Sequence, residues 1–430
     1  MEAPRQGGNS LMRALFADHS AFLDEMERRA RHVQRQLREQ KNTALILGAG
    51  VSQSVKLPSW DRLLARATFL LTNIGNADPF YGPGCKDDPH NARLYNSLNQ
   101  VFNGTDALEV AEYIDLVLSK YGSQRRGALL PLGSGDSDER VKGLVRYCLY
   151  DRPVFSVAEH VGRDTTLWMT ARLAARRFYV ERGQQKNRSV ITYNYDNLLE
   201  AVAGSSDFLA ETGTPLEVLS LFDEADPPPL GTLRRLNVFH PHGFIDLCTP
   251  NRQESQSVVL SEKSFYGMEQ KNYSWSNFLL ARAIYDDVCL FIGFSGNDYN
   301  FRRIMKNLDD VRPDGEEPHR FLVVTIDELV FQVLRMYADI SGQHAGDYDA
   351  PALEPRHLEG MDEHVRRRIL SYLYQKEIYW KTKGVLPIWT TIADTPGLIA
   401  GLSEEDDGKR GKEACYFRKT RGSNQELLKM

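Results

Sequence analysis

A short apolar run that ends in glycines constrains the fold more than any other stretch of the chain. Residues 44–47 are apolar, and the sequence continues as Gly48-Ala49-Gly50. Such a run, bounded by turn residues, is typical of a buried parallel strand. A helix beginning near Ser52 would direct its first N–H groups and the positive end of its dipole towards the glycines. The stretch therefore predicts a nucleotide-binding turn.

The same stretch departs from the dinucleotide fingerprint. That fingerprint is Gly-x-Gly-x-x-Gly, with an acidic residue about twenty positions further on for the ribose. Here Gln53 stands in place of the third glycine, and no second strand ends in an acid near position 68. An ordinary nicotinamide dehydrogenase is therefore disfavoured. Taken alone, the stretch is equally compatible with a plain glycine-rich turn between a strand and a helix.

Composition excludes several other classes. The chain has 430 residues, of which 42% are apolar and 26% charged, as in globular proteins with one large or two medium domains. A net charge of −5 gives no global basic field, so direct nucleic-acid binding is not indicated.

Cysteine usage and the N-terminal sequence bear on metal binding and location. The five cysteines are far apart and form no Cys-x-x-Cys pair, so neither a zinc module nor a disulfide framework is predicted. No basic segment precedes an apolar one near the start, and no apolar run approaches the length of a membrane span. We therefore expect a cytoplasmic protein that has no metal and no membrane contact.

Later apolar runs extend the sheet. Six of them predict strands: Val190 to Thr192, Leu236 to Phe239, Val258 to Leu260, Val288 to Ile292, Phe321 to Ile326 and Val385 to Trp389. Helical patterns lie between several of them, at residues 275–285, 327–337 and 362–374. This alternation predicts an α/β protein with a Rossmann-like, mostly parallel sheet and helices on both faces.

Periodicity and charge divide the rest of the chain. Residues 1–42 form an N-terminal helical segment, and residues 43–400 form the domain that contains the sheet. Within it, residues 76–185 alternate between helical patterns and Gly-, Pro- and Ser-rich connections and predict a helical insertion. Residues 401–430 are predicted to be a charged C-terminal tail.

Four predicted strands end in residues that can do chemistry. The four stretches are Gly48-Ala49-Gly50-Val51-Ser52, Thr192-Tyr193-Asn194-Tyr195-Asp196, His240-Pro241-His242-Gly243 and Gly293-Phe294-Ser295-Gly296-Asn297-Asp298. In open α/β sheets, ligands bind beyond the carboxyl ends of the strands. Each stretch also has a simpler explanation, because Asn and Asp cap helices, and His-Gly and Gly-x-Ser-Gly occur in ordinary turns.

The order of these motifs resembles the sirtuin family. The shared motifs are Gly-Ala-Gly-Val-Ser at 48–52 with Pro58 after it, Thr-x-Asn-x-Asp-x-Leu at 192–198, His-Gly at 242–243 and Gly-x-Ser at 293–295. The runs at 57–60, 194–200 and 293–298 are similar to its bacterial branch of NAD-consuming antiphage-defence proteins. The resemblance covers roughly residues 43–393, with the helical insertion as an interruption.

Two departures bear on the activity. Sirtuin deacylases carry a four-cysteine zinc module, which this sequence lacks. Their Gly-Ile-Pro-Asp-Phe-Arg loop corresponds to residues 56–61, where the glycine, the acid and the arginine are replaced and an aromatic residue, Trp60, is kept. The resemblance therefore implies a nucleotide site more strongly than it implies deacylation.

The resemblance, together with side-chain chemistry, assigns roles. The residues expected to contact the dinucleotide are Gly48, Ala49, Gly50, Ser52, Trp60, Asn194, Asp196, Gly293, Ser295 and Asp298. The residues expected to carry the reaction are Asn194, Asp196 and His242. Asn194 can hold a ribose hydroxyl or a water, Asp196 can offset positive charge on the ribose, and His242 can accept a proton. His240 is the rival base, and His242 is preferred because a glycine follows it.

The main hypothesis is a gated NAD+ glycohydrolase of antiphage defence by abortive infection, releasing nicotinamide and ADP-ribose. Alternatives are a non-catalytic subunit that senses NAD or ADP-ribose, and an NAD-dependent deacylase or ADP-ribosyltransferase. The resemblance implies gating by homo-oligomerisation or by a separately encoded subunit such as a HerA-type hexameric ATPase.

Overall fold

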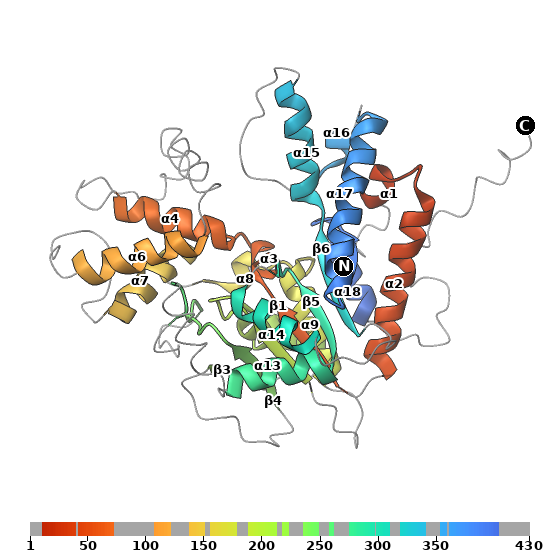
Figure 1. Cartoon of the computed structure of the whole chain (residues 1–430). Helices are drawn as coiled ribbons and strands as arrows, with labels where there is room; N and C mark the ends of the chain where they lie inside the picture. Colours follow the sequence, from red (N-terminus) through yellow and green to blue (C-terminus); the bar gives the residue numbers. More distant parts are fainter. Residues whose placement is uncertain are drawn as a thin grey trace, which may run out of the picture.

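A seven-stranded, wholly parallel sheet forms the centre of the computed structural model (Figure 1). The structure describes residues 11–39, 42–72, 107–121, 137–150, 155–178, 188–212, 217–222, 235–248, 258–261, 275–296, 298–309, 319–340, 353–358 and 361–403. The strands are β1 (Thr43–Leu47), β2 (Arg188–Thr192), β3 (Glu217–Phe222), β4 (Arg235–His240), β5 (Val288–Ile292), β6 (Arg320–Thr325) and β7 (Leu386–Thr390). This confirms the predicted Rossmann-like α/β fold.

The strand order places the predicted site at a topological switch point. The order across the sheet is β3-β4-β2-β1-β5-β6-β7. From β1 the chain adds strands on one side as far as β3 and β4, and then returns to the other side of β1 with β5. The chain therefore leads from β1 to β2 on one side and from β5 to β6 on the other side. Where two neighbouring parallel strands connect to opposite sides in this way, a crevice forms at their carboxyl ends. The four chemically unusual stretches all follow β1, β2, β4 or β5.

Helices cover both faces of the sheet. One face packs against α9 (Thr166–Phe178), α10 (Leu198–Ala203) and α18 (Thr395–Ser403), and the other against α13 (Trp275–Asp286) and α14 (Tyr299–Asp309). Within β1, Leu45 and Leu47 belong to the first core, whereas Ala44 and Ile46 belong to the second. A strand buried on both faces needs apolar residues at every position, which explains the continuous run in the sequence.

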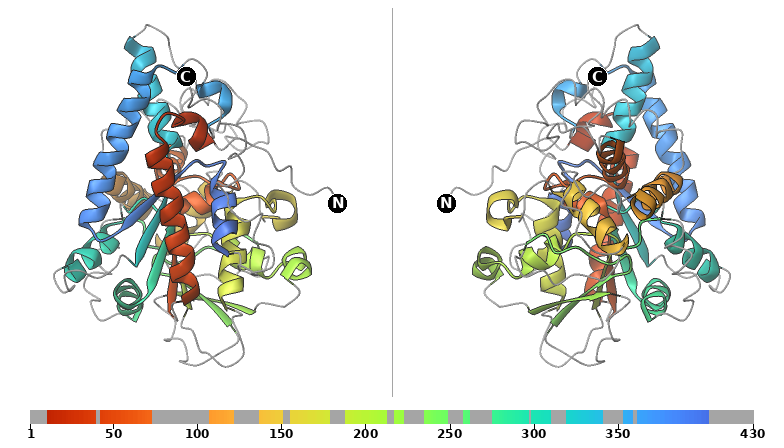
Figure 2. Two further views of the ribbon diagram at one scale, coloured as in Figure 1. Left: turned by 90° about the vertical axis from the view of Figure 1, so that its right-hand side faces the viewer. Right: turned by 90° about the vertical axis from the view of Figure 1, so that its left-hand side faces the viewer.

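Two groups of helices flank the sheet (Figures 1 and 2). On one side α4 (Trp60–Thr72), α6 (Ala107–Tyr121) and α7 (Ser137–Leu149) contact one another. The other group has its own apolar core, to which α1 (Leu11–Leu15), α2 (Ser20–Glu39), α15 (Asp327–Ile340), α16 (Pro355–Leu358) and α17 (Glu363–Thr382) contribute. In both figures α15 and α17 extend beyond the edge of the sheet.

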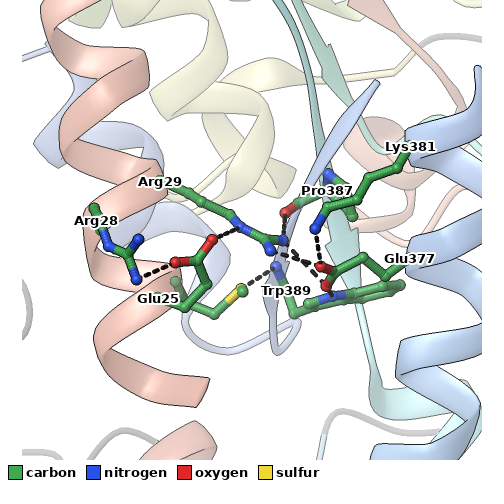
Figure 3. A network of polar contacts seen from close by, with 8 residues as sticks. Glu25, Arg28, Arg29, Glu377, Lys381, Pro387 and Trp389 are labelled. Atoms are coloured by element: carbon green, nitrogen blue, oxygen red, sulfur yellow. Dashed lines mark hydrogen bonds and ion pairs between the residues drawn. The ribbon is translucent and has the colours of Figure 1, made fainter. Parts of the chain in front are cut away.

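A buried polar network ties α2 to α17 and β7 (Figure 3). Arg29 donates to Glu377 through Nη2, at 2.7 Å, and to the carbonyl of Pro387 through Nη1, also at 2.7 Å. Lys381 lies one turn after Glu377 and approaches the same carboxylate at 2.7 Å. The side chains of Arg29 and Glu377 are 4% and 9% exposed, so the network joins segments from the two ends of the described chain within the core.

Several predicted boundaries were wrong. Residues 258–260 are not a strand, and β3 was not predicted. The helix after β1, α3, covers Ala49–Gln53 and so begins at once after Gly48, not near Ser52. Helix α17 continues eight residues beyond the predicted end at Tyr374, since it runs to Thr382. Helix α18 runs to Ser403 with Leu402 and Ser403 buried, so residues 401–403 belong to the fold.

The remaining described helices are α8 (Val157–His160) and α11 (Ser206–Thr212). Within the part of the predicted insertion that the structure describes, the regular elements are helices. Among the described helices none has the length and apolar character that crossing a bilayer requires.

Candidate functional site

The glycines after β1 make contact with the chain that leaves β5. The N–H of Gly50 donates to the carbonyl of Gly293 at 2.9 Å. A Cβ atom on Gly48 would lie 2.5 Å from that carbonyl oxygen, and one on Gly50 would lie 2.7 Å from the Cα of Gly293. The close packing gives these glycines a structural role, whatever they contact on their other side. They are required because two strand exits meet backbone to backbone.

Ser52, Asn194 and Asp196 form one hydrogen-bonded cluster across the carboxyl ends of β1 and β2. The amide Nδ2 of Asn194 donates to Ser52 Oγ at 3.0 Å, and Ser52 Oγ donates to Asp196 Oδ2 at 2.8 Å. All three residues are buried. Ser52 lies 142 residues before Asn194 and 144 before Asp196, and the parallel pairing of β1 with β2 brings it to them.

Asp196 also binds the start of the helix that follows it. Its Oδ1 accepts from the backbone N–H of Leu198, the first residue of α10, at 3.1 Å. The N-cap residue itself is Asn197, so the carboxylate of Asp196 binds both Ser52 and the first residue of the helix from one position before the cap. Burial raises the pKa of Asp196 above its ordinary value, and the hydrogen bonds from Ser52 and Leu198 act in the opposite direction. The structure thus holds a carboxylate at some electrostatic cost, which is common at functional sites.

Asn194 presents an unused acceptor at this edge. Its Oδ1 is buried and has no hydrogen-bond partner among the described residues. An unpaired buried carbonyl oxygen costs roughly 1–3 kcal/mol, so a donor from a ligand would relieve a real penalty. A ribose hydroxyl or a water supplies such a donor.

His242 faces Asp298 from the other side of the switch point. The ring nitrogen Nε2 of His242 lies 3.1 Å from Asp298 Oδ2, and the two side chains are 7% and 9% exposed. The edge of the Tyr193 ring contacts the imidazole, with 5.0 Å between ring centroids. Tyr193 immediately precedes Asn194 in the sequence, so the residue that contacts the imidazole is joined through the backbone to a member of the Ser52 cluster.

His240, the rival base, belongs to a different cluster. Its Nε2 lies 2.6 Å from Glu200 Oε1, and Ser220 donates to the same oxygen at 2.9 Å. Phe244 covers the His240 ring, with 4.7 Å between centroids. His240 is 1% exposed. This histidine is therefore enclosed by α10, β3 and its own loop, away from the Tyr193 contact that His242 makes.

Aromatic side chains surround the cluster. Trp60 at the start of α4 lies against Tyr195, with 5.9 Å between ring centroids, and Tyr195 donates to the carbonyl of Val259 at 2.5 Å. Burial raises the pKa of Tyr193 and of Tyr195 well above the ordinary value, with a further contribution from Asp298. Both phenols are therefore neutral near neutral pH.

The other predicted contact residues lie at the same edge with less enclosure. Ala49 is in the first turn of α3 and half-buried, and the side chain of Ser295 is exposed. Gly293 has φ 60°, the left-handed conformation that favours glycine. All the predicted contact residues therefore follow β1, β2 or β5, apart from Trp60, which reaches the edge from α4.

Sequence reasoning missed two groups at this edge. Tyr193 and Tyr195 alternate with Asn194 and Asp196, and this alternation is the signal that could have identified them as packing partners of the cluster. Glu200 and Ser220 join His240, and nothing in the sequence spacing indicated that contact, because β3 itself was missed. In the described part of the chain there is no group of three His, Cys, Asp or Glu side chains that could hold a metal ion.

One comparison with known proteins bears on this geometry. Residues 188–340 match the family model described as the SIR2-like domain, which supports a sirtuin-like assignment and NAD-related activity. The matched segment runs from the start of β2 through α15, so it includes Asn194, Asp196, His242 and Asp298. Strand β1 and its glycines lie outside it. No curated protein matches the chain.

Proposed function

We propose that the chain hydrolyses NAD+ to nicotinamide and ADP-ribose. A water oxygen forms a bond to C1′ of the nicotinamide ribose while the bond from C1′ to the nicotinamide nitrogen breaks. The bonding electron pair leaves with nicotinamide, which departs as a neutral base and needs no acid. The surplus proton of the water passes to a base and then to solvent.

The observation that carries the proposal is the buried Ser52–Asn194–Asp196 cluster with its unused Asn194 Oδ1 at the switch point. Asn194 would hold a ribose hydroxyl or the attacking water. Asp196 would offset the positive charge that develops on the ribose. His242, across Tyr193 from the cluster, would take the proton from water.

The direct test is turnover by the full chain. Purified protein is incubated with NAD+, and nicotinamide and ADP-ribose are quantified by chromatography. Asn194→Ala and His242→Ala are each expected to reduce kcat by about 100-fold or more. Matched controls are Asn307→Ala on α14 and His364→Ala on α17, where both side chains are exposed and turnover should stay within twofold. Equal turnover in all four variants would contradict the proposal.

The alternatives predict different results in the same experiment. A sensor binds NAD+ or ADP-ribose in calorimetry but releases no nicotinamide. A deacylase consumes NAD+ only when an acylated peptide is present, and an ADP-ribosyltransferase only when a protein acceptor becomes labelled. These outcomes are separable, because each alternative requires a different second substrate or none.

We further propose that the activity is gated and serves antiphage defence. Unrestrained NAD+ hydrolysis would deplete the producing cell, so a hydrolase of this kind has to be held inactive until a trigger arrives. Self-assembly or a separately encoded activating subunit, such as a HerA-type hexameric ATPase, would supply the gate. Native mass measurement tests self-assembly, and phage plating with wild type and Asn194→Ala tests the role in defence.

A further inference from the structure

The contact between His242 and Asp298 joins two strands that are not neighbours. In the sheet, β4 and β5 are separated by β2 and β1. The segments that follow β4 and β5 nevertheless meet, with 3.1 Å between His242 Nε2 and Asp298 Oδ2. The pair therefore spans the carboxyl ends of the two central strands, where the Ser52 cluster lies.

Tyr193 packs against the histidine of this contact. Its ring meets the imidazole of His242 edge-on, and it also packs against Phe294, with 5.1 Å between centroids. Phe294 and Phe301 in turn contact each other at 4.8 Å. The histidine and the carboxylate are thus supported by an aromatic layer that extends from β2 to α14.

Both oxygens of Asp298 are close to protein groups. While Oδ2 faces His242, Oδ1 accepts from the backbone N–H of Phe301 in the first turn of α14 at 2.7 Å. This cap fixes the carboxylate relative to a helix whose Phe301 is 2% exposed. Because both oxygens already face protein groups, Asp298 is better placed to orient the imidazole than to bind a dinucleotide.

The segment that carries Asp298 is itself braced. Gly296, two residues earlier, has φ 71°, and a Cβ atom there would lie 2.1 Å from the ring of Trp380 at the end of α17. The Trp380 side chain therefore constrains the chain at Gly296, two positions before Asp298. A positioning role requires a rigid support of this kind.

We propose that Asp298 positions His242 and stabilises the positive charge that its imidazole acquires when it takes the proton from water, and that Asp298 is not a ligand of the dinucleotide. This inference rests on the proposed NAD+ hydrolysis and reassigns a residue that the sequence placed among the cofactor contacts. A carboxylate that faces one ring nitrogen fixes the orientation of the imidazole and favours its protonated form in the transition state.

Asp298→Asn is the informative variant. Asparagine has the same shape and is also a good helix N-cap, so the bond to Phe301 and the fold are retained while the charge is lost. Asp287→Asn is the matched control, because Asp287 is a buried carboxylate that immediately precedes β5, whereas Asp298 follows that strand. Both variants and the wild type are compared as full chains in kcat and KM for NAD+ and in the Kd for ADP-ribose.

We expect Asp298→Asn to lower kcat by about 30-fold or more and to leave the Kd for ADP-ribose within threefold. In the His242→Ala background the same change should cost less than threefold, because the residue acts through the imidazole. A tenfold rise in Kd with kcat unchanged would return Asp298 to dinucleotide binding and overturn the inference. So would unchanged kcat and Kd.

A second measurement does not need turnover. With ¹⁵N-labelled histidine, the imidazole resonances of His242, assigned by their absence in His242→Ala, should shift in Asp298→Asn and not in Asp287→Asn. Unshifted resonances would overturn the inference. If wild type releases no nicotinamide, the proposed function fails, and the resonances alone decide whether the carboxylate orients the ring.

Discussion

Arg29 on α2 and Glu377 on α17 form a buried ion pair, with 2.7 Å between Nη2 and Oε1, although 348 residues separate them in the sequence. Burying two charges is costly unless both are well paired and hydrogen-bonded. Here Glu25, Lys381 and the carbonyl of Pro387 complete the network around the pair (Figure 3). The packing of α2 therefore depends on a carboxylate from the last part of the fold.

The ion pair should stabilise the protein at neutral pH and lose this contribution in acid. Burial acts to raise the pKa of Glu377, and the hydrogen bonds from Arg29 and Lys381 outweigh it and lower the pKa to about 2. Its stabilisation is thus present above about pH 4.5 and is lost as the pH falls towards 2. Glu377→Gln should lower the free energy of unfolding by about 2–3 kcal/mol at pH 7 and by much less near pH 2.

Urea unfolding at several pH values measures this difference. Glu363→Gln on the same helix is the control, because Glu363 pairs with Arg367 at the surface and should contribute less than about 0.5 kcal/mol. If Glu377→Gln lowers the free energy of unfolding by the same amount at pH 7 and at pH 2, the effect does not come from ionised Glu377.

The buried carboxylate of Asp287 should make the free energy of unfolding depend on pH in the opposite direction. Burial raises its pKa from 3.8 to about 6, partly offset by Arg282. Because the folded pKa is the higher one, the ionised carboxylate destabilises the fold above pH 6 and has no such effect below about pH 4. Asp287→Asn should raise the free energy of unfolding by up to about 2–3 kcal/mol at pH 7.5. Thermal unfolding at pH 7.5 and at pH 4 checks this, with the exposed Asp286→Asn as control.

Adding a single methyl group at Gly293 should strongly destabilise the protein. It has φ 60°, and a Cβ atom there would lie 2.4 Å from the backbone nitrogen of Val51. Gly293→Ala should destabilise the protein by about 3 kcal/mol or more. Gly401 in α18 has no atom within 4 Å of the corresponding position, and Gly401→Ala should stabilise by about 0.5–1 kcal/mol through helix propensity. Chemical denaturation measures both, and equal effects would refute the close contact of the strand exits.

The hydrogen bond from Ser52 to Asp196 should influence how turnover depends on pH. The buried carboxyl of Asp196 has a pKa above the ordinary 3.8, and the bond from Ser52 lowers it. In the proposed reaction Asp196 acts as an anion, so turnover falls as the pH drops through this raised pKa. Ser52→Ala should reduce kcat about tenfold and move the acid limb to higher pH. Ser205→Ala should do neither, because the Ser205 hydroxyl donates to the carbonyl of Val202 and accepts from the N–H of Phe208, both local backbone groups. An unmoved acid limb in Ser52→Ala would contradict the role of Asp196.

The sheet could be predicted from the sequence because its central strands are buried on both faces. Strands β1 and β5 are continuous apolar runs, and β5 was predicted to the residue. Strand β3, at the edge, was missed because Glu217 and Ser220 interrupt its apolar pattern. Residues 258–260 have the apolar pattern of a short strand. In the structure Val258 and Leu260 are buried, but the segment does not pair in a ladder.

The site could be predicted as a set of residues but not as a set of contacts. The parallel topology brings the strand ends together, so Ser52, Asn194 and Asp196 meet as the motifs suggested. That Asp298 faces His242 depends on the path of loops across two intervening strands, which no local pattern encodes. The packing of Gly48 and Gly50 on Gly293 was not predicted for the same reason, since Gly293 follows a strand whose position beside β1 the sequence does not state.

The position of β1 in the middle of the sheet also governs when the protein can assemble. Its partners on either side begin at Arg188 and Val288, so both neighbours leave the ribosome long after β1 itself. Until then an apolar strand with two open edges is exposed to aggregation, and the late arrival of β5 delays completion of the edge at which the Ser52 cluster lies. Chains truncated before residue 288 would therefore depend on chaperones for solubility, whatever the quality of their N-terminal helices.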